Sequence, residues 1–307
     1  MDHRGRSIEE GTRATPNASA FTLVELLVVI AIIAVLLAIF IPATRLARER
    51  GQRAVCLSNL RQLTIAWIAY ADQHDGRLVN GSAFGVSIRG TRRLESWVGD
   101  AFQYPESRSA LLENPVKGAL WRDIRDIDVY RCPRGRSGHA VTYAMVVACN
   151  NAADIEGTSV PGSGGQEVAD FGRRVGSTVL KLTRLTDIVS PGPSLRAVFV
   201  DIGQTPISGD YYAHYLAPRW KVASPPLTTH ADGTTFSMAD GHAEYWKWKG
   251  RETVEMPRIS FTSHGALCET LASKSDYEPQ TEDGLYDLQR LQRATWGRLG
   301  YSTGSVP

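Results

Sequence analysis

The stretch from Phe21 to Ile41 reads FTLVELLVVIAIIAVLLAIFI, and Thr22 and Glu25 are its only polar residues. A helix needs about 20 apolar residues to cross the hydrocarbon core of a bilayer. This stretch therefore predicts a membrane-spanning helix over residues 21–41.

Glu25 stands near the start of this span. On insertion scales, a carboxylate at mid-membrane costs about 2.5 to 3.5 kcal/mol, and less toward the interface. In one interpretation Glu25 lies at the headgroup level of a simple membrane anchor. In the other it meets a cation inside a bundle of helices, where opposite charges attract more strongly than in water.

The residues around Glu25 resemble the N-terminal processing and methylation segment of type IV pilins and type II secretion pseudopilins. In that family a dedicated peptidase cuts just before an aromatic residue. The mature chain then has an acidic residue at its fifth position and a proline at its twenty-second. A cut between Ala20 and Phe21 places Glu25 fifth and Pro42 twenty-second. The chain departs from the family in one respect, because Ala20 stands where glycine is usual.

The resemblance implies that Met1–Ala20 is a cytoplasmic leader peptide and that Phe21 becomes N-methylated. This leader lacks the apolar core of an ordinary secretory signal peptide. Once Phe21 is the first residue, its amine is a cation, because a free α-amino group has a pKa near 8. The family then implies that Glu25 pairs with the N-terminus of a neighbouring subunit and, together with Pro42, serves filament assembly.

The implied partners are the prepilin peptidase, other pilin or pseudopilin subunits, the inner-membrane assembly platform and the lipid bilayer. The implied location is the inner membrane, crossed once, with a periplasmic C-terminal domain and a filament after assembly. Arg and Lys counts around the span do not set this orientation, which depends on the resemblance alone. The net charge of +2 gives no bulk electrostatic case for a nucleic-acid partner.

Apolar residues continue at helical spacing past Pro42, through Leu57, Leu60 and Trp67. This pattern predicts that one helix extends over residues 21–74, with an amphipathic second half. Pro42 lacks a backbone N–H, so we expect it to kink or locally melt the helix.

Residues 75–307 predict one α+β globular domain with an antiparallel sheet. Asp75-Gly76 is a turn signal that separates this domain from the helix. The amphipathic half of the helix needs a cover for its apolar face, which this domain supplies in the predicted pilin-like fold. Residues 283–296 predict a helical tail.

A second motif begins at His230, which is followed by nine residues and then by Asp240-Gly241. This H-x9-DG pattern resembles the signature of a group of pseudopilin-like proteins. An Asp-Gly pair between two alternating runs is also a strong signal for a type I′ turn with two residues in the loop. The predicted register pairs Ala239 with His242 and Phe236 with Tyr245. It places one set of side chains on the core face (Phe236, Met238, Ala243 and Tyr245) and another on the opposite face (Thr235, Ser237, Glu244, Trp246 and Trp248).

This motif is expected to be structural. A straight strand would separate His230 from Asp240 by about 33 Å, so each residue marks a turn at one end of the strand. The alternative is a divalent cation site, for which Asp232 and Asp240 are the candidate ligands. Major type II pseudopilins carry a structural calcium ion, and the resemblance suggests Ca²⁺ as the cofactor to consider; otherwise none is expected.

The four cysteines are Cys56, Cys132, Cys149 and Cys268. They allow three complete pairings, and disulfides are permitted outside the cytoplasm. Cys56–Cys132 would clamp the helix to the domain, and Cys132–Cys149 would be a local bridge. No CxxC or paired Cys/His spacing suggests zinc, which argues against a metal–thiolate site.

The sequence contains no phosphate-binding loop, and its Gly-x-Ser-x-Gly spacing at residues 300–304 is not interpreted as a nucleophile elbow. The expected function is therefore that of a structural subunit of a pilus or a type II secretion pseudopilus, without catalytic activity. The competing class is a membrane-anchored surface domain that binds or hydrolyses a ligand and uses a pilin-like anchor. For that class, the aromatic run 211–215 is a candidate groove lining.

Overall fold

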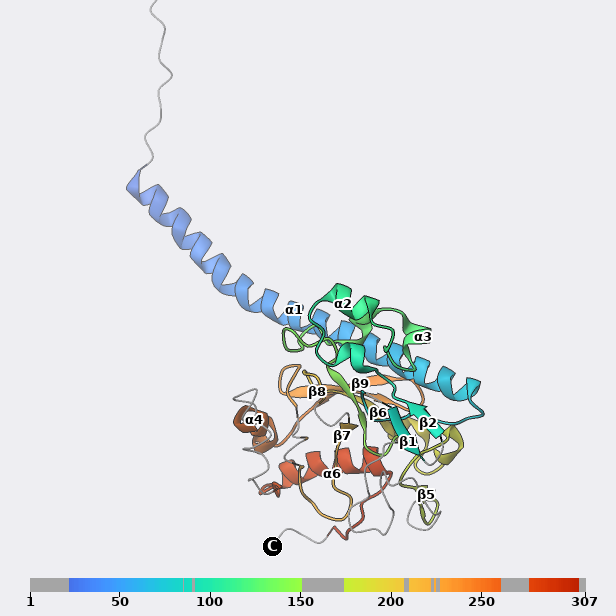
Figure 1. Cartoon of the computed structure of the whole chain (residues 1–307). Helices are drawn as coiled ribbons and strands as arrows, with labels where there is room; N and C mark the ends of the chain where they lie inside the picture. The colour runs from blue at the N-terminus through green and yellow to red at the C-terminus, as the bar shows by residue number, and fades with distance from the viewer. Residues whose placement is uncertain are drawn as a thin grey trace, which may run out of the picture. The chain divides into compact units, whose positions relative to one another are not determined.

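The computed structural model describes residues 22–84, 86–89, 92–150, 174–206, 210–221, 224, 227–260 and 276–303, with only the backbone described for 86–89, 92–94 and 257–260. The chain divides into two compact units, one ending at Arg48 and one beginning at Glu49. Figure 1 shows the elements of both units.

Helix α1 spans Leu23–Gln73 and takes part in both units. Its N-terminal part is long and apolar enough to cross a membrane. The helix is unbroken at Pro42, so the predicted local melting does not occur. Near the proline, the Oγ1 atom of Thr44 donates a hydrogen bond of 2.9 Å to the carbonyl of Ile41.

The second unit is built on a five-stranded sheet with strand order β7-β3-β6-β8-β9. The strand bounds are Asp210–Tyr211 (β7), Tyr143–Val146 (β3), Ala197–Asp201 (β6), Gly233–Met238 (β8) and Ala243–Lys247 (β9). All neighbours are antiparallel except β3 and β7, which are parallel, so the sheet is mixed. The predicted α+β class is confirmed.

Smaller elements surround this sheet. Two further hairpins are formed by β1 with β2 (Val86–Arg89 and Arg92–Glu95) and by β4 with β5 (Arg174–Val175 and Thr178–Val179). The helices are α2 (Arg108–Glu113), α3 (Trp121–Ile124), α4 (Arg251–Ser260) and α6 (Glu282–Trp296). The 3₁₀ turns are η1 (Asp100–Phe102), η2 (Ile127–Tyr130), η3 (Leu185–Asp187) and η4 (Pro193–Leu195). Helix α6 is the predicted helical tail.

The C-terminal part of α1 and helix α6 lie on opposite sides of the sheet (Figure 1). On the α1 side, Thr64 donates a 2.6 Å hydrogen bond to Ser237 of β8, and the Arg53 guanidinium lies 4.3 Å from the centre of the Tyr245 ring of β9. On the other side, the Arg290 guanidinium of α6 lies 3.8 Å from the centre of the Trp246 ring. The α1 side chains buried by this arrangement are Cys56, Asn59, Leu60, Leu63, Thr64, Ala66, Trp67 and Ala71.

The predicted register of the β8–β9 hairpin is wrong by one residue. Thr235 pairs with Tyr245, and Phe236 pairs with Glu244. Side chains alternate between the two faces along a strand. A slip of one residue in the pairing therefore moves all the side chains of one strand to the opposite face relative to its partner strand. Phe236 therefore shares its face with Trp246, and their ring centres are 4.2 Å apart. Tyr245 instead faces α1.

The turn chemistry explains this difference. Gly241 has φ +93°, whereas Asp240 is not among the residues with positive φ. The N–H of Gly241 bonds to the carbonyl of Met238 at 2.9 Å, and the N–H of Met238 bonds to the carbonyl of His242 at 2.8 Å. This is a three-residue loop whose last residue, glycine, is left-handed, and it replaces the predicted two-residue type I′ turn.

We predict that Gly241→Ala lowers the free energy of unfolding by about 1 to 2 kcal/mol, because alanine is strained at positive φ. The new Cβ would meet only the Cδ1 of Ile68, at 4.0 Å, so the effect isolates backbone strain. Chemical denaturation of the detergent-solubilised chain measures it. Gly192→Ala is the control, because Gly192 has φ −62° and open space around it. Equal stability of the two variants would contradict the assigned turn.

Candidate functional site

The N-terminus of α1 is closed by Thr22 and Glu25. Glu25 Oε2 accepts hydrogen bonds from the backbone N–H of Thr22 at 2.8 Å and from its hydroxyl at 2.7 Å. The Glu25 N–H donates in return to Thr22 Oγ1 at 3.2 Å. This is a capping box, in which each residue satisfies a backbone donor of the other. The Thr-x-x-Glu spacing was visible in the sequence, but its local role was not predicted.

The apolar part of α1 offers an uncovered surface within its own unit. Every side chain from Thr22 to Ile41 is exposed. Leu23 is 80% exposed and Ile39 is 70% exposed, values far above those of residues in a protein core. The predicted leader, Ala20 and Phe21 lie outside the described residues.

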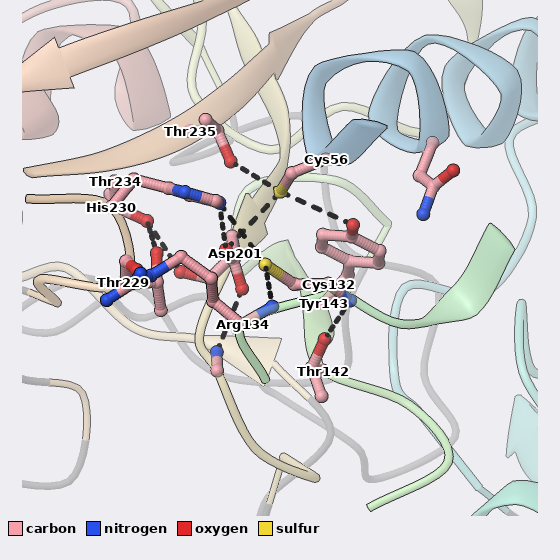
Figure 2. A network of polar contacts seen from close by, with 12 residues as sticks. Cys56, Cys132, Arg134, Thr142, Tyr143, Asp201, Thr229, His230, Thr234 and Thr235 are labelled. Carbon is pink, nitrogen blue, oxygen red and sulfur yellow. Dashed lines mark hydrogen bonds and ion pairs between the residues drawn. The ribbon is translucent and has the colours of Figure 1, made fainter. Parts of the chain in front are cut away.

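A second site lies inside the other unit. Cys56, Cys132, Asp201 and His230 each place one metal-ligating atom within 4.8 Å of all the others. All four residues are 0% exposed. They come from α1, from the segment after η2, from the end of β6 and from the turn before β8. Figure 2 shows these side chains pointing toward one another. We call this group the Cys₂AspHis cluster.

Short contacts connect the members of the cluster. The thiol of Cys56 donates to Asp201 Oδ2 at 3.4 Å, and Cys132 Sγ lies 3.2 Å from His230 Nε2. His230 Nε2 also lies 3.6 Å from Asp201 Oδ2. Two thiols, one imidazole and one carboxylate therefore converge on a common point.

Local backbone geometry holds each ligand in place. His230 and Gly233 exchange backbone hydrogen bonds of 3.1 Å around Ala231, which has φ +48°, so His230 is held by a tight entry turn. The N–H of Cys132 donates to Thr142 Oγ1 at 2.7 Å. Asp201 Oδ1 accepts from the N–H of Gly203 at 2.9 Å. The predicted structural turn at His230 is thus present, and it also positions the imidazole.

Burial decides the charge states in the cluster. Loss of solvation raises the pKa of the Cys56 thiol well above its usual value, and the neighbouring Cys132 and the charge of Asp201 add to this. Burial likewise raises the pKa of Asp201, despite the hydrogen bonds that it accepts. Burial, together with the positive charges of Arg134 and Arg53, lowers the pKa of His230 to about 4. A neutral imidazole at His230 is therefore favoured at physiological pH.

The predicted cation ligands do not join this cluster. Asp232 and Asp240 are both exposed. Asp240 Oδ1 accepts from the N–H of His242 at 3.1 Å and lies 2.6 Å from His242 Nδ1. A calcium ion at Asp232 or Asp240 stays a prediction. Sequence reasoning missed Asp201 as a site residue, because it ends a strand with no recognisable motif around it.

The predicted disulfides among the described cysteines are not formed. Cys56, Cys132 and Cys149 are buried free thiols. Cys132 contacts His230, and Cys149 donates to the carbonyl of Ala197 at 3.5 Å, so these two thiols have other neighbours. Cys268 lies outside the described residues.

Two observations concern the competing hypothesis, in which the protein is a membrane-anchored domain that binds or hydrolyses a ligand. A cavity of about 550 Å³ is lined by Tyr70, His74, Trp121 and Arg122, among others. The His74 ring stacks on that of Tyr70, and its Nδ1 lies 2.6 Å from the Tyr70 carbonyl, so this imidazole is already engaged. Most of the aromatic run 211–215 is buried and does not line an open groove.

Residues 15–41 match the family model of the prokaryotic N-terminal methylation motif. The match includes Glu25 and ends one residue before Pro42. This motif indicates processing by a prepilin peptidase, and together with the apolar helix it supports anchoring in a membrane. Comparisons of the chain with curated proteins and with solved structures gave no match. Membership of the H-x9-DG group stays a prediction.

Proposed function

Because its methylation motif marks this chain as a type IV pilin-like or pseudopilin-like protein, we propose that it is a structural subunit of a pilus or a type II secretion pseudopilus. One observation carries the proposal. The matched methylation motif lies on a helix, and every side chain of that helix from Leu23 to Ile41 is exposed within its own unit. Such a surface requires lipid before assembly and neighbouring helices after it.

Processing and assembly follow one order in this proposal. The prepilin peptidase removes the leader on the cytoplasmic side and leaves Phe21 as an N-methylated first residue. The chain crosses the inner membrane once and presents its globular domain to the periplasm. An inner-membrane platform then moves the subunit into the filament, and the α1 helices pack side by side. The subunit itself performs no catalysis.

Glu25 is the assembly residue in this proposal. Glu25 accepts two hydrogen bonds from Thr22, and both end on Oε2. Oε1 accepts none from the residues that the structure describes. The carboxylate can therefore keep its hydrogen bonds to Thr22 through Oε2 and still face the amine of a neighbouring Phe21 through Oε1. The attraction between this carboxylate and that amine grows as water is excluded.

We expect N-terminal sequencing of the chain from a membrane fraction that contains its peptidase to begin at Phe21. Intact mass should then exceed that of the unmethylated chain that begins at Phe21 by one CH₂ unit, because methylation replaces one hydrogen of the amine with a methyl group. Ala20→Gly is the matched control and should be cut at the same bond, because glycine is the usual residue there.

A membrane-extracted chain that still begins at Met1 in the presence of active peptidase would contradict the proposal. It would favour the competing surface-anchored domain, which needs no processing. Processing at Phe21 without recovery of the chain in sheared filaments would support the motif but argue against assembly.

A further inference from the structure

We propose that Cys56, Cys132, Asp201 and His230 bind one Zn²⁺ ion in a closed tetrahedral site. The four side chains are the Cys₂AspHis cluster described above. This site is independent of filament assembly, because all four residues belong to the unit that begins at Glu49.

The distances between the ligand atoms fit a tetrahedron around zinc. Zn–S bonds are about 2.3 Å and Zn–N and Zn–O bonds about 2.0 to 2.2 Å, so the edges of the tetrahedron are roughly 3.3 to 3.8 Å. Three of the six distances between ligand atoms are 3.4 Å (Cys56–Asp201), 3.6 Å (Asp201–His230) and, slightly short of this range, 3.2 Å (Cys132–His230). The remaining pairs lie within 4.8 Å, so only small shifts would close the site.

The kinds of ligand select the metal. Thiolate and imidazole donors in a tetrahedral arrangement favour zinc over calcium or magnesium, which prefer oxygen ligands at higher coordination numbers. Four protein ligands leave no open position for water, which is typical of structural zinc sites and not of catalytic ones. The complete burial of all four residues agrees with a closed site.

Donors already surround the two sulfur atoms. The Tyr143 hydroxyl donates to Cys56 Sγ at 3.4 Å, and Thr235 Oγ1 lies 3.0 Å from the same atom. The backbone N–H of Arg134 donates to Cys132 Sγ at 3.4 Å. Hydrogen bonds of this kind stabilise thiolates, which are the form of cysteine that binds metal. Figure 2 shows these contacts.

The carboxylate of Glu49 lies on the Nδ1 side of the His230 ring, away from the other ligands. Glu49 Oε1 and His230 Nδ1 are buried, and neither has a hydrogen-bond partner among the described residues. The two atoms are 3.7 Å apart, slightly too far for a hydrogen bond. In metal sites, a histidine that binds through Nε2 commonly donates its Nδ1–H to a carboxylate. A metal on Nε2 would fix the Nδ1–H tautomer, and a small shift would satisfy both atoms.

Chain neighbours of three of the ligands also line a cavity. A cavity of about 240 Å³ is lined by Arg134, Ile202, Gly203 and Thr229. These residues are chain neighbours of Cys132, Asp201 and His230. An ion entering through this cavity would therefore arrive beside three of the four ligands.

The consequence for the fold is a metal clamp. Cys56 is on α1, whereas the other three ligands come from β6 and from segments outside the helix. Bound zinc would connect α1 to the sheet within the unit that begins at Glu49. This clamp takes the place of the disulfide that Cys56 and Cys132 would otherwise form.

The test uses the full chain, purified in detergent with a reducing agent and without chelator. Elemental analysis should find about one zinc per chain. After removal of zinc with a chelator, added Co²⁺ should produce the absorption bands of a tetrahedral thiolate site. A chain that folds but holds neither metal would overturn the proposal.

Single substitutions test each ligand. Cys132→Ser and His230→Gln should each lower zinc affinity by more than about 100-fold, because loss of an outer-shell partner alone costs about 10- to 100-fold. Cys149→Ser is the matched control, since Cys149 is a buried free thiol outside the cluster. It should bind zinc like the unmodified chain. Equal zinc content in all three variants would overturn the assignment.

A measurement on the unmodified chain covers the case in which ligand variants fail to fold. Cys56 and Cys132 should resist alkylation in the zinc-loaded chain and become modified after zinc is removed. Cys149 should react to the same extent in both states. Peptide mapping that instead joins Cys56 to Cys132 by a disulfide in freshly isolated protein would overturn the proposal.

Discussion

We expect Glu25→Ala to leave the protein in the membrane and, if the proposed function holds, to keep it out of the filament. The apolar stretch 21–41 still inserts, because removal of its one carboxylate makes insertion more favourable. In the proposed filament, the amine of the neighbouring subunit's Phe21 would then have no partner in a low-dielectric bundle. We expect the amount of the variant in sheared filaments to fall by about 100-fold or more relative to the membrane-bound pool, as measured by immunoblot.

Two companion variants separate charge pairing from helix capping. Glu25→Gln keeps a side-chain oxygen that can accept from the Thr22 N–H but has no charge, so it should fail to assemble like Glu25→Ala. Thr22→Val removes the hydroxyl half of the capping box and leaves the carboxylate, so it should assemble. Normal assembly of Glu25→Gln would show that Glu25 serves as a cap and not as an ionic partner.

Trp67→Ala should lower the free energy of unfolding of the globular unit by about 3 to 5 kcal/mol. Trp67 is 0% exposed and belongs to the main hydrophobic core, although it is part of the same helix as the membrane segment. Its indole Nε1 has no hydrogen-bond partner among the described residues. The loss therefore measures packing, and chemical denaturation of the detergent-solubilised chain records it.

Ile65→Ala is the matched control for Trp67→Ala. Ile65 lies on the same turn of α1 but is 60% exposed, so we expect a change within about 0.5 kcal/mol. If Trp67→Ala were as stable as this control, the second half of α1 would be a linker outside the core, and the observed packing of the helix on the sheet would be wrong.

Local sequence rules predicted the elements better than their contacts. The long helix, the helical tail and the hairpin at Asp240-Gly241 depend on periodicity and turn chemistry, which nearby residues control. The hairpin register failed because an Asp-Gly pair is compatible with both a two-residue and a three-residue loop. In the structure, the three-residue loop is accompanied by the packing of Tyr245 against Arg53 and of Phe236 against Trp246, contacts that no local rule contains.

The sequence by itself determined the apolar helix and its methylation motif, because length, composition and short spacings are properties of a continuous segment. The Cys₂AspHis cluster could be decided only by the tertiary structure. Its ligands stand at positions 56, 132, 201 and 230, and no local spacing connects them. They meet because α1 packs on the sheet and because β6 and β8 are neighbours. Long-range packing of this kind depends on the whole core and leaves no pattern in any one segment.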